Sequence, residues 1–209
     1  MDRPSAGAVP APRALRRAGL RLEWATLGWN VTEAVVAIWA GAVAGSVSLI
    51  GFGADSIIES LSGVALVWRL LGHEDDAGRD RIALRLVGIS FLALAAYVGY
   101  EAATSLIRSE EPEASVTGIV LAALSLIVMP LLAHAKRRVA RGMRSDALAA
   151  DARQTDICAN LSAILLVGLG LNAWLGWWWA DPVAGLAMAP LIAREGFDAL
   201  RGKGCGCRP

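Results

Sequence analysis

Long apolar stretches alternate with short polar segments along the whole chain. Most of these stretches reach about 20 residues, the length that an α-helix needs to cross the hydrocarbon core of a bilayer. We expect six membrane-spanning helices, near residues 23–44, 46–71, 82–107, 115–135, 147–174 and 183–193. Before the last of them, Asp181 followed by Pro182 is typical of an N-cap with proline at the first helical position. The pattern therefore predicts an all-α integral membrane protein, built as a bundle of six transmembrane helices.

Arginine and lysine are distributed unevenly among the connecting segments. They are frequent in the N-terminal residues, after the second and fourth spans and in the C-terminal tail, whereas the other connections hold almost none. Because segments rich in Lys and Arg stay in the cytoplasm, we expect both termini on the cytoplasmic side of the cell (inner) membrane. The expected organisation is a basic arm at residues 1–21, a six-helix transmembrane domain at 22–200 and a short cytoplasmic tail at 201–209.

The composition agrees with a membrane protein and argues against other classes. Of the 209 residues, 56% are hydrophobic and 19% are charged. The net charge of +1, without a basic stripe interleaved with aromatic residues, indicates no nucleic-acid partner. Three cysteines, one in a span and two in the tail, make no readable disulfide framework. We expect the lipid bilayer as the environment of the chain and do not expect an enzyme.

Two acidic residues, Asp55 and Glu59, lie near the middle of the second apolar stretch. A charged side chain at the centre of a membrane helix costs about 2.5–3.5 kcal/mol on insertion scales, and such residues are by default functional. Their i, i+4 spacing places both carboxylates on one face of the helix. Adjacent negative charges in a low dielectric repel each other, which calls for a shared proton or a bound cation. We therefore predict half of an intramembrane cation site here.

Polar residues early in the fifth span are candidates for the other half of the site. Asp151, Gln154 and Cys158 share one face of a helix. At about 1.5 Å per residue, Gln154 and Cys158 reach a depth comparable to that of Asp55 and Glu59, with Asp151 closer to the cytoplasm. Structural roles remain open, since glutamine commonly joins membrane helices, cysteine packs as a small apolar residue, and Asp151 could cap the helix or pair with an arginine.

Five further residues are possible accessory ligands. Asn30 and Glu33 lie near mid-depth on the first span, although Glu33 could equally pair with an arginine or a backbone group. Asp156 falls on roughly the opposite face of the fifth span. Cys205 and Cys207 offer two thiolates, too few for a closed tetrahedral zinc site. The two thiolates could pass a soft metal to the entrance, complete a site across a dimer, or belong to a flexible reduced tail.

These features resemble the cation diffusion facilitator (cation efflux) family, over its transmembrane domain at about residues 20–200. The matching residues are Gly45-Ser46-Val47-Ser48-Leu49 before Ala54-Asp55-Ser56-Ile57-Ile58-Glu59-Ser60, and Ser145-Asp146-Ala147-Leu148 before Ala150-Asp151-Ala152. The resemblance implies six spans, with Asp-x-x-x-Asp on the second and His-x-x-x-Asp on the fifth forming a tetrahedral zinc site. It also implies exchange of metal for protons by alternating access, usually by a homodimer.

The chain departs from the family pattern at three positions of this site. Glu59 stands where the family has its second aspartate, Gln154 where it has histidine, and Cys158 where it has the aspartate of the fifth span. The loss of the imidazole leaves an oxygen-rich set with one thiol. We expect the metal site to consist of Asp55, Glu59, Asp151, Gln154 and Cys158. Zinc is the first candidate for the bound metal, and manganese, iron and cobalt are alternatives.

Three functions are compatible with these patterns. The one we expect is a secondary transporter that carries a divalent metal cation out of the cytoplasm in exchange for protons, because carboxylates bind metal when deprotonated and release it when protonated. The second is a non-transporting membrane protein that keeps the fold for metal sensing or assembly, which the missing histidine motivates. The third is an exporter of small organic cations, for which the acidic pair would be the counter-ion.

Overall fold

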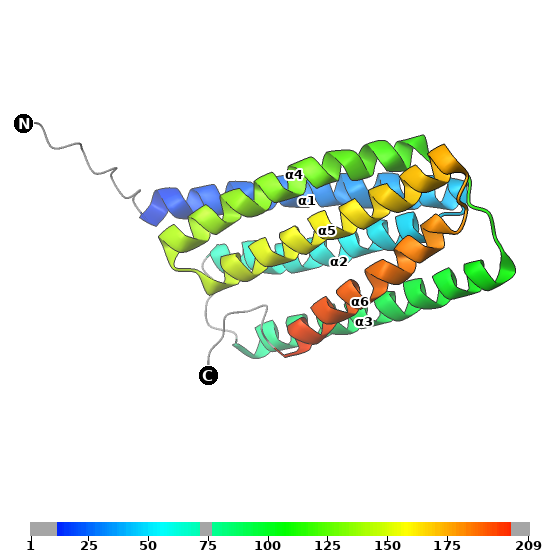
Figure 1. Cartoon of the computed structure of the whole chain (residues 1–209). Coiled ribbons are helices and arrows are strands. Elements are labelled where there is room, and N and C mark those ends of the chain that lie inside the picture. Colours follow the sequence, from blue (N-terminus) through cyan, green and yellow to red (C-terminus); the bar gives the residue numbers. More distant parts are fainter. Residues whose placement is uncertain (1–11, 72–76, 202–209) are drawn as a thin grey trace, which may run out of the picture.

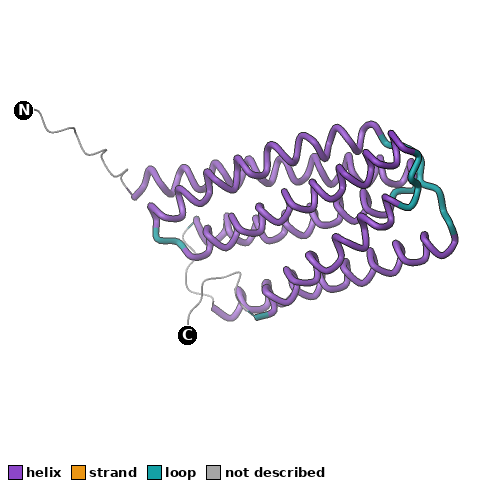
Figure 2. Tube along the Cα trace, viewed as in Figure 1, coloured by secondary structure: helices purple, strands orange, loops and turns teal. Residues whose placement is uncertain are grey.

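A computed structural model describes residues 12–71 and 77–201, which are almost entirely helical (Figure 1). The helices are α1 (Pro12–Ala44), α2 (Val47–Leu70), α3 (Ala77–Arg108), α4 (Val116–Met143), α5 (Asp146–Leu175) and α6 (Ala180–Leu200). Figure 2 shows them running back and forth along one axis, joined by loops at the two ends. The all-α six-helix bundle predicted from the sequence is confirmed.

Two groups of helices make up the bundle. Helices α1, α2, α4 and α5 pack together, and α3 pairs with α6 beside them (Figure 1). Helix α2 contacts α1, α3, α5 and α6, so it lies between the two groups. This central position buries one face of α2, the face that carries Asp55 and Glu59, away from lipid.

The two ends of the bundle differ in charge. At one end, called the basic end here, α1 begins, α6 finishes, and α4 carries the basic residues 136–144 (Figure 1). At the opposite end lie Gly45 and Ser46, residues 109–115 with three glutamates, and residues 176–179 with three tryptophans. The described start of α1 and the end of α6 therefore lie at the same end of the bundle.

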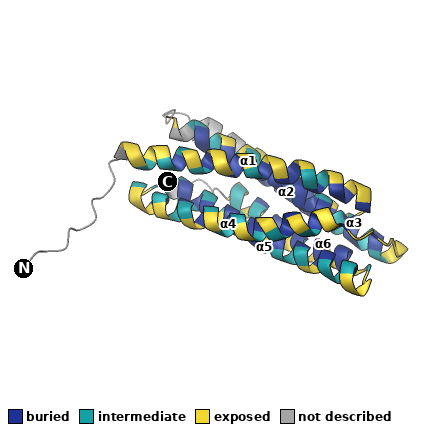
Figure 3. Cartoon of the chain, turned by 90° about the horizontal axis from the view of Figure 1, so that it is seen from above, coloured by how far each residue is buried: buried dark blue, intermediate teal, exposed yellow. Residues whose placement is uncertain are grey.

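The outer faces of the helices suit a lipid environment. Within the described ranges, α1 to α5 are long and apolar enough to cross a membrane. On α1, Val31, Val35, Trp39 and Val43 are spaced four residues apart and are all more than half exposed. Figure 3 shows such exposed stripes on the outside of the helices and the buried stripes between them. Helix α6 is less apolar, because Asp181, Arg194 and Glu195 interrupt it.

Several helix boundaries differ from those expected. Helix α1 begins at Pro12, eleven residues before Glu23, so much of the expected N-terminal arm is a continuation of the first span. Helix α4 continues to Met143 instead of ending near Ala135. A hydropathy pattern marks where lipid contact ends, whereas a helix of arginine, lysine and alanine can continue into water, because these residues have high helix propensity.

The expected N-cap of the last helix is wrong. Helix α6 begins at Ala180 with Trp179 as its N-cap residue, and Asp181 lies inside the first turn. The Asp181 carboxylate is buried and accepts hydrogen bonds from the hydroxyls of Ser46, at 2.6 Å, and of Ser48. Asp181 therefore joins the start of α6 to the start of α2.

Candidate metal centre

Asp55 and Glu59 lie on the interior face of α2. Their exposed fractions are 3% and 7%, so both carboxylates are removed from solvent and from lipid. The helix presents them one above the other because they are four residues apart. Gly53, half a turn before Asp55, allows α1 to approach closely, since a Cβ there would lie 2.8 Å from the Ile38 side chain. The absence of a side chain at Gly53 thus brings polar residues of α1 close to the two carboxylates.

Cys158 on α5 completes a group of three ligand-type side chains. One oxygen of Asp55, one oxygen of Glu59 and the Cys158 sulfur all lie within 4.8 Å of one another, and all three residues are buried. Donor atoms around a tetrahedral zinc ion are about 3.3–3.8 Å apart, given Zn–O and Zn–S bonds of about 2.0–2.3 Å. The three donor atoms therefore need to approach one another by at most about 1.5 Å to form such a coordination shell. The structure brings together three of the five residues predicted for the site.

Glu33 on α1 lies directly behind this group. Its Oε2 accepts hydrogen bonds from the Ser56 hydroxyl at 3.0 Å and from the Cys158 thiol at 3.9 Å. Its Oε1 accepts one from the Trp29 indole at 3.0 Å. Glu33 is therefore a third carboxylate, next to Cys158, and three side-chain donors hold it in position. The sequence placed Glu33 at the right depth, but the anchoring by Trp29 and Ser56 could not be read from it.

Asn30, one turn before Glu33, contacts the site from its other side. Its Nδ2 donates to Glu59 Oε2 at 3.1 Å, and the residue is 1% exposed. The amide donor fixes the Glu59 carboxylate without adding charge. Asn30 therefore acts in this structure as a hydrogen-bond donor to a candidate ligand.

Asp151 and Gln154 lie nearer to the basic end than Cys158. The Lys136 ammonium donates to Asp151 and, at 3.3 Å, to Glu23 Oε2. The Gln154 carbonyl oxygen accepts from the Ser62 hydroxyl at 3.3 Å. These two predicted site residues thus have other partners, and both line a small cavity on the basic side of Glu59.

Lys136 and Glu23 form a buried ionic cluster that the sequence analysis did not find. Both side chains are fully buried, and the Lys136 ammonium also lies 3.5 Å from the Thr155 hydroxyl. Lys136 is the first residue of a basic run, and Glu23 stands at the expected start of the first span. The apolar pattern places both at the boundary of a span, but the two helices continue past them and bury them. An acidic and a basic residue at equal depth on two of the spans would have been the signal.

The remaining accessory candidates lie elsewhere. Asp156 forms an ion pair with Arg137 on the outside of α4 and α5, where both side chains are more than one-third exposed. Cys205 and Cys207 lie outside the described residues. Cys158 is a free, buried cysteine.

Comparisons with known proteins agree with the fold. Residues 82–203, more than half of the chain, match the cation efflux transmembrane domain. The matched range includes Cys158 but not Asp55 or Glu59. The chain is also 29% identical, over 178 residues, to an uncharacterized transporter of Methanocaldococcus jannaschii. That alignment covers 81% of this chain and 62% of the relative, so the chain spans less than two thirds of the relative's length.

The fold, the apolar outer surface and the matched domain lead to one assignment. The described helical bundle encloses a buried group of carboxylates and a thiol, and more than half of the chain matches one family of membrane transporters. That family consists of cation transporters and not of enzymes. The chain belongs to the cation efflux family.

Proposed function

We propose that the protein transports a divalent metal cation out of the cytoplasm in exchange for protons, and that Asp55, Glu59 and Cys158 bind the cation. The observation that carries the proposal is the convergence of three buried donor atoms from α2 and α5 within 4.8 Å. Buried polar groups in a membrane bundle are expensive, which makes three together at one point unfavourable unless they bind something.

Proton exchange follows from the charges of the same groups. Two carboxylates and a thiol this close together repel each other when all are ionised, so they need either a cation or protons. Metal binding requires deprotonated ligands and releases their protons. One site that takes up either metal or protons is the minimum needed for antiport, provided that it opens to one side at a time.

Zinc fits the donor set best. A thiolate favours zinc over manganese, and two or three carboxylates complete a tetrahedral shell, with Glu33 as the nearest additional donor. Manganese, iron and cobalt are alternative substrates. Asp151 and Gln154 would act on the cytoplasmic side of the centre, and the Cys205 and Cys207 thiols would deliver metal to the entrance.

The proposal includes the orientation and the assembly expected from the sequence. The basic end faces the cytoplasm, which places both termini of the chain there, and the chain works as a homodimer in the cell membrane. The distribution of Lys and Arg supports the orientation. Membership of the family supports the dimer. Mass photometry of the protein in nanodiscs measures the dimer directly.

Flux measurements in sealed vesicles test the proposal. Zinc uptake into proteoliposomes with a pH gradient is expected for the wild type and should fall to the background of empty vesicles in Asp55→Asn. The matched control is Asp156→Asn, the same chemical change on the outside of α5, which should retain wild-type flux. Equal flux in Asp55→Asn and wild type would contradict the proposal. Zinc binding without any flux would favour the metal-sensing alternative.

A further inference from the structure

Lys136 places a positive charge inside the bundle. Its ammonium, on α4, contacts Glu23 on α1 and Asp151 and Thr155 on α5, so one group ties three helices together. The side chains of Lys136 and Glu23 have no exposed surface. Buried ion pairs cost several kcal/mol of desolvation per ion and seldom improve stability over apolar packing. A role in binding therefore explains this cluster better than a role in stability does.

The cluster holds two acidic side chains for one basic side chain. Two carboxylates face one ammonium, and within the part of the chain that the structure describes Glu23 Oε1 has no hydrogen-bond partner. A buried, unpartnered carboxylate oxygen is costly, which favours a donor or cation beside it. The arrangement is that of a cation site in which a tethered ammonium occupies the cation position.

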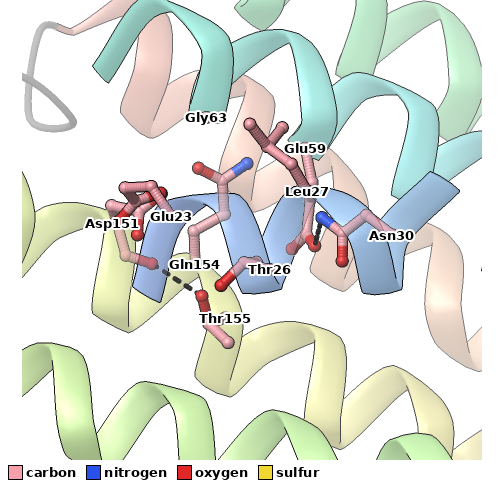
Figure 4. A pocket seen from close by; sticks show the side chains of 9 residues that line it. All are labelled: Glu23, Thr26, Leu27, Asn30, Glu59, Gly63, Asp151, Gln154 and Thr155. Carbon is pink, nitrogen blue, oxygen red and sulfur yellow. Dashed lines mark hydrogen bonds between the residues drawn. The ribbon is translucent and has the colours of Figure 1, made fainter. Parts of the chain in front are cut away.

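A small polar cavity links this cluster to the metal centre. Its lining includes Glu23 and Asp151 at one side and Glu59 and Asn30 at the other, with the Gln154 side chain drawn between them in Figure 4. The cavity has a volume of about 10 Å³, enough for about one water molecule. Asn30 Oδ1 and Gln154 Nε2, like Glu23 Oε1, are buried without a partner among the described residues. These three atoms, out of five such atoms among the described residues, belong to residues that line this one cavity.

The cluster also lies on the route that a cation from the basic end would take. Counting from the opposite end at about 1.5 Å per residue, Asp55 and Glu59 lie about 12 and 18 Å along α2. Glu23, Lys136 and Asp151 lie about 30–36 Å along their own helices, near one interface of a hydrocarbon core about 30 Å thick. The cavity thus lies between the ionic cluster and the two carboxylates nearer the membrane centre.

We propose that Glu23 and Asp151 form a second binding site for a divalent metal cation, which the Lys136 ammonium blocks in this structure. An entering cation displaces Lys136, whose flexible four-carbon stem lets the ammonium move towards water at the basic end. The cation then passes the cavity to reach Glu59. The route rests on the proposed transport function, whereas the second site itself does not.

Metal-binding stoichiometry tests the second site. Zinc is titrated by calorimetry into detergent-purified full chain in which Cys205→Ser and Cys207→Ser remove the tail thiols. Besides the zinc at the metal centre, the Lys136→Met variant should bind a second zinc ion per chain. Its affinity for this second ion should be at least about tenfold higher than that of wild type, because no ammonium competes. Glu23→Gln in the same background should abolish binding of this second ion, and Asp55→Asn should leave it intact. If Lys136→Met does not bind a second zinc ion more tightly than wild type does, the proposal is overturned.

A second measurement uses the intact cluster, in case Lys136→Met fails to fold. The chain has two lysines, Lys136 and Lys203, so labelling by an amine-reactive reagent can be followed by peptide mass spectrometry with Lys203 as the reference. Saturating zinc should increase labelling of Lys136 several-fold, in wild type and in Asp55→Asn alike. Labelling of Lys136 that zinc leaves unchanged or lowers would overturn the proposal. The proposed function fails separately, if Asp55→Asn binds and transports zinc as wild type does.

Discussion

Cys158 gives the candidate centre its chemical character. It is the one sulfur donor in a group whose other members are carboxylates, and it is fully buried beside Glu33. Soft thiolate ligands favour zinc, whereas an all-oxygen site suits manganese or magnesium. We therefore expect the identity of this one side chain on α5 to determine which cations the proposed site prefers.

Replacing Cys158 with serine should change this preference. Cys158→Ser keeps the size of the side chain and removes the soft donor, so zinc affinity should fall by about tenfold or more, corresponding to about 1.4 kcal/mol, while manganese affinity changes less. Calorimetric titration with both metals measures the shift. The double variant Cys205→Ser/Cys207→Ser is the control and should retain the zinc affinity of the centre. An unchanged zinc-to-manganese ratio in Cys158→Ser would contradict the role of the thiol.

At the scale of single residues, the sequence predicts part of the site and misses part of it. The i, i+4 rule and the depth estimate correctly placed Asp55, Glu59 and Cys158 together. The same rules put Asp151 and Gln154 on the correct face of α5, but they could not reveal Lys136, which reaches Asp151 from α4. Helical periodicity describes one helix at a time, whereas this salt bridge depends on how a second helix, α4, packs against α5. Metal binding by any of these residues stays a prediction.

Close packing of α1 against α2 holds the centre together at the scale of elements. Asn30 contacts Glu59, and Glu33 contacts Ser56, both across the α1–α2 interface. The approach depends on Gly53, because a Cβ there would lie 2.8 Å from Ile38 Cγ1 and 3.0 Å from Ala37 Cβ. Two hydrogen bonds of the site therefore rest on the absence of one side chain.

The variant Gly53→Ala should separate the two helices. The added methyl group overpacks the interface, which typically costs about 1–3 kcal/mol of unfolding free energy, and metal affinity should fall as the α1–α2 hydrogen bonds lengthen. The control is Gly170→Ala on α5, where nothing lies within 4 Å of the added atom. That variant should gain up to about 1 kcal/mol from helix propensity. Reversible unfolding in mixed detergent measures both changes, and destabilisation of both variants to the same extent would contradict the packing argument.

Hydropathy predicted the existence and order of the elements, but not their ends or their connections. The apolar pattern indicated all six helices because lipid imposes a minimum length on each span. It could not show that Asp181 bonds to Ser46 and Ser48 instead of capping its own helix, since that contact joins residues more than 130 positions apart. Local signals such as Asp-Pro describe a preference, which tertiary contacts override when the residue is buried.

At the scale of the whole molecule, the unequal ends give the bundle a direction. The basic end carries the Glu23–Lys136–Asp151 cluster, and the opposite end carries acidic and tryptophan-containing loops. If the basic end faces the cytoplasm, a metal ion meets the ionic cluster first and the candidate centre second. The direction of transport and the order of the two sites are thus linked.

Cysteine accessibility in intact cells tests this orientation. In a cysteine-free background, Glu111→Cys in the α3–α4 loop should react with a membrane-impermeant maleimide added outside. Arg138→Cys on α4 should react only after the membrane is permeabilised, because we propose that the basic end faces the cytoplasm. Both positions are exposed, so burial does not explain a difference. The reverse pattern would contradict the proposed topology.

Anomalous scattering from crystals grown with zinc tests the central claim most directly, because it reports the metal and its ligands together. We predict a zinc peak bonded to Asp55, Glu59 and Cys158 at about 2.0–2.3 Å. The peak should disappear in Asp55→Asn and persist in Asp156→Asn. Zinc bound elsewhere in the bundle, with the Asp55, Glu59 and Cys158 side chains free of it at saturating concentration, would contradict the account.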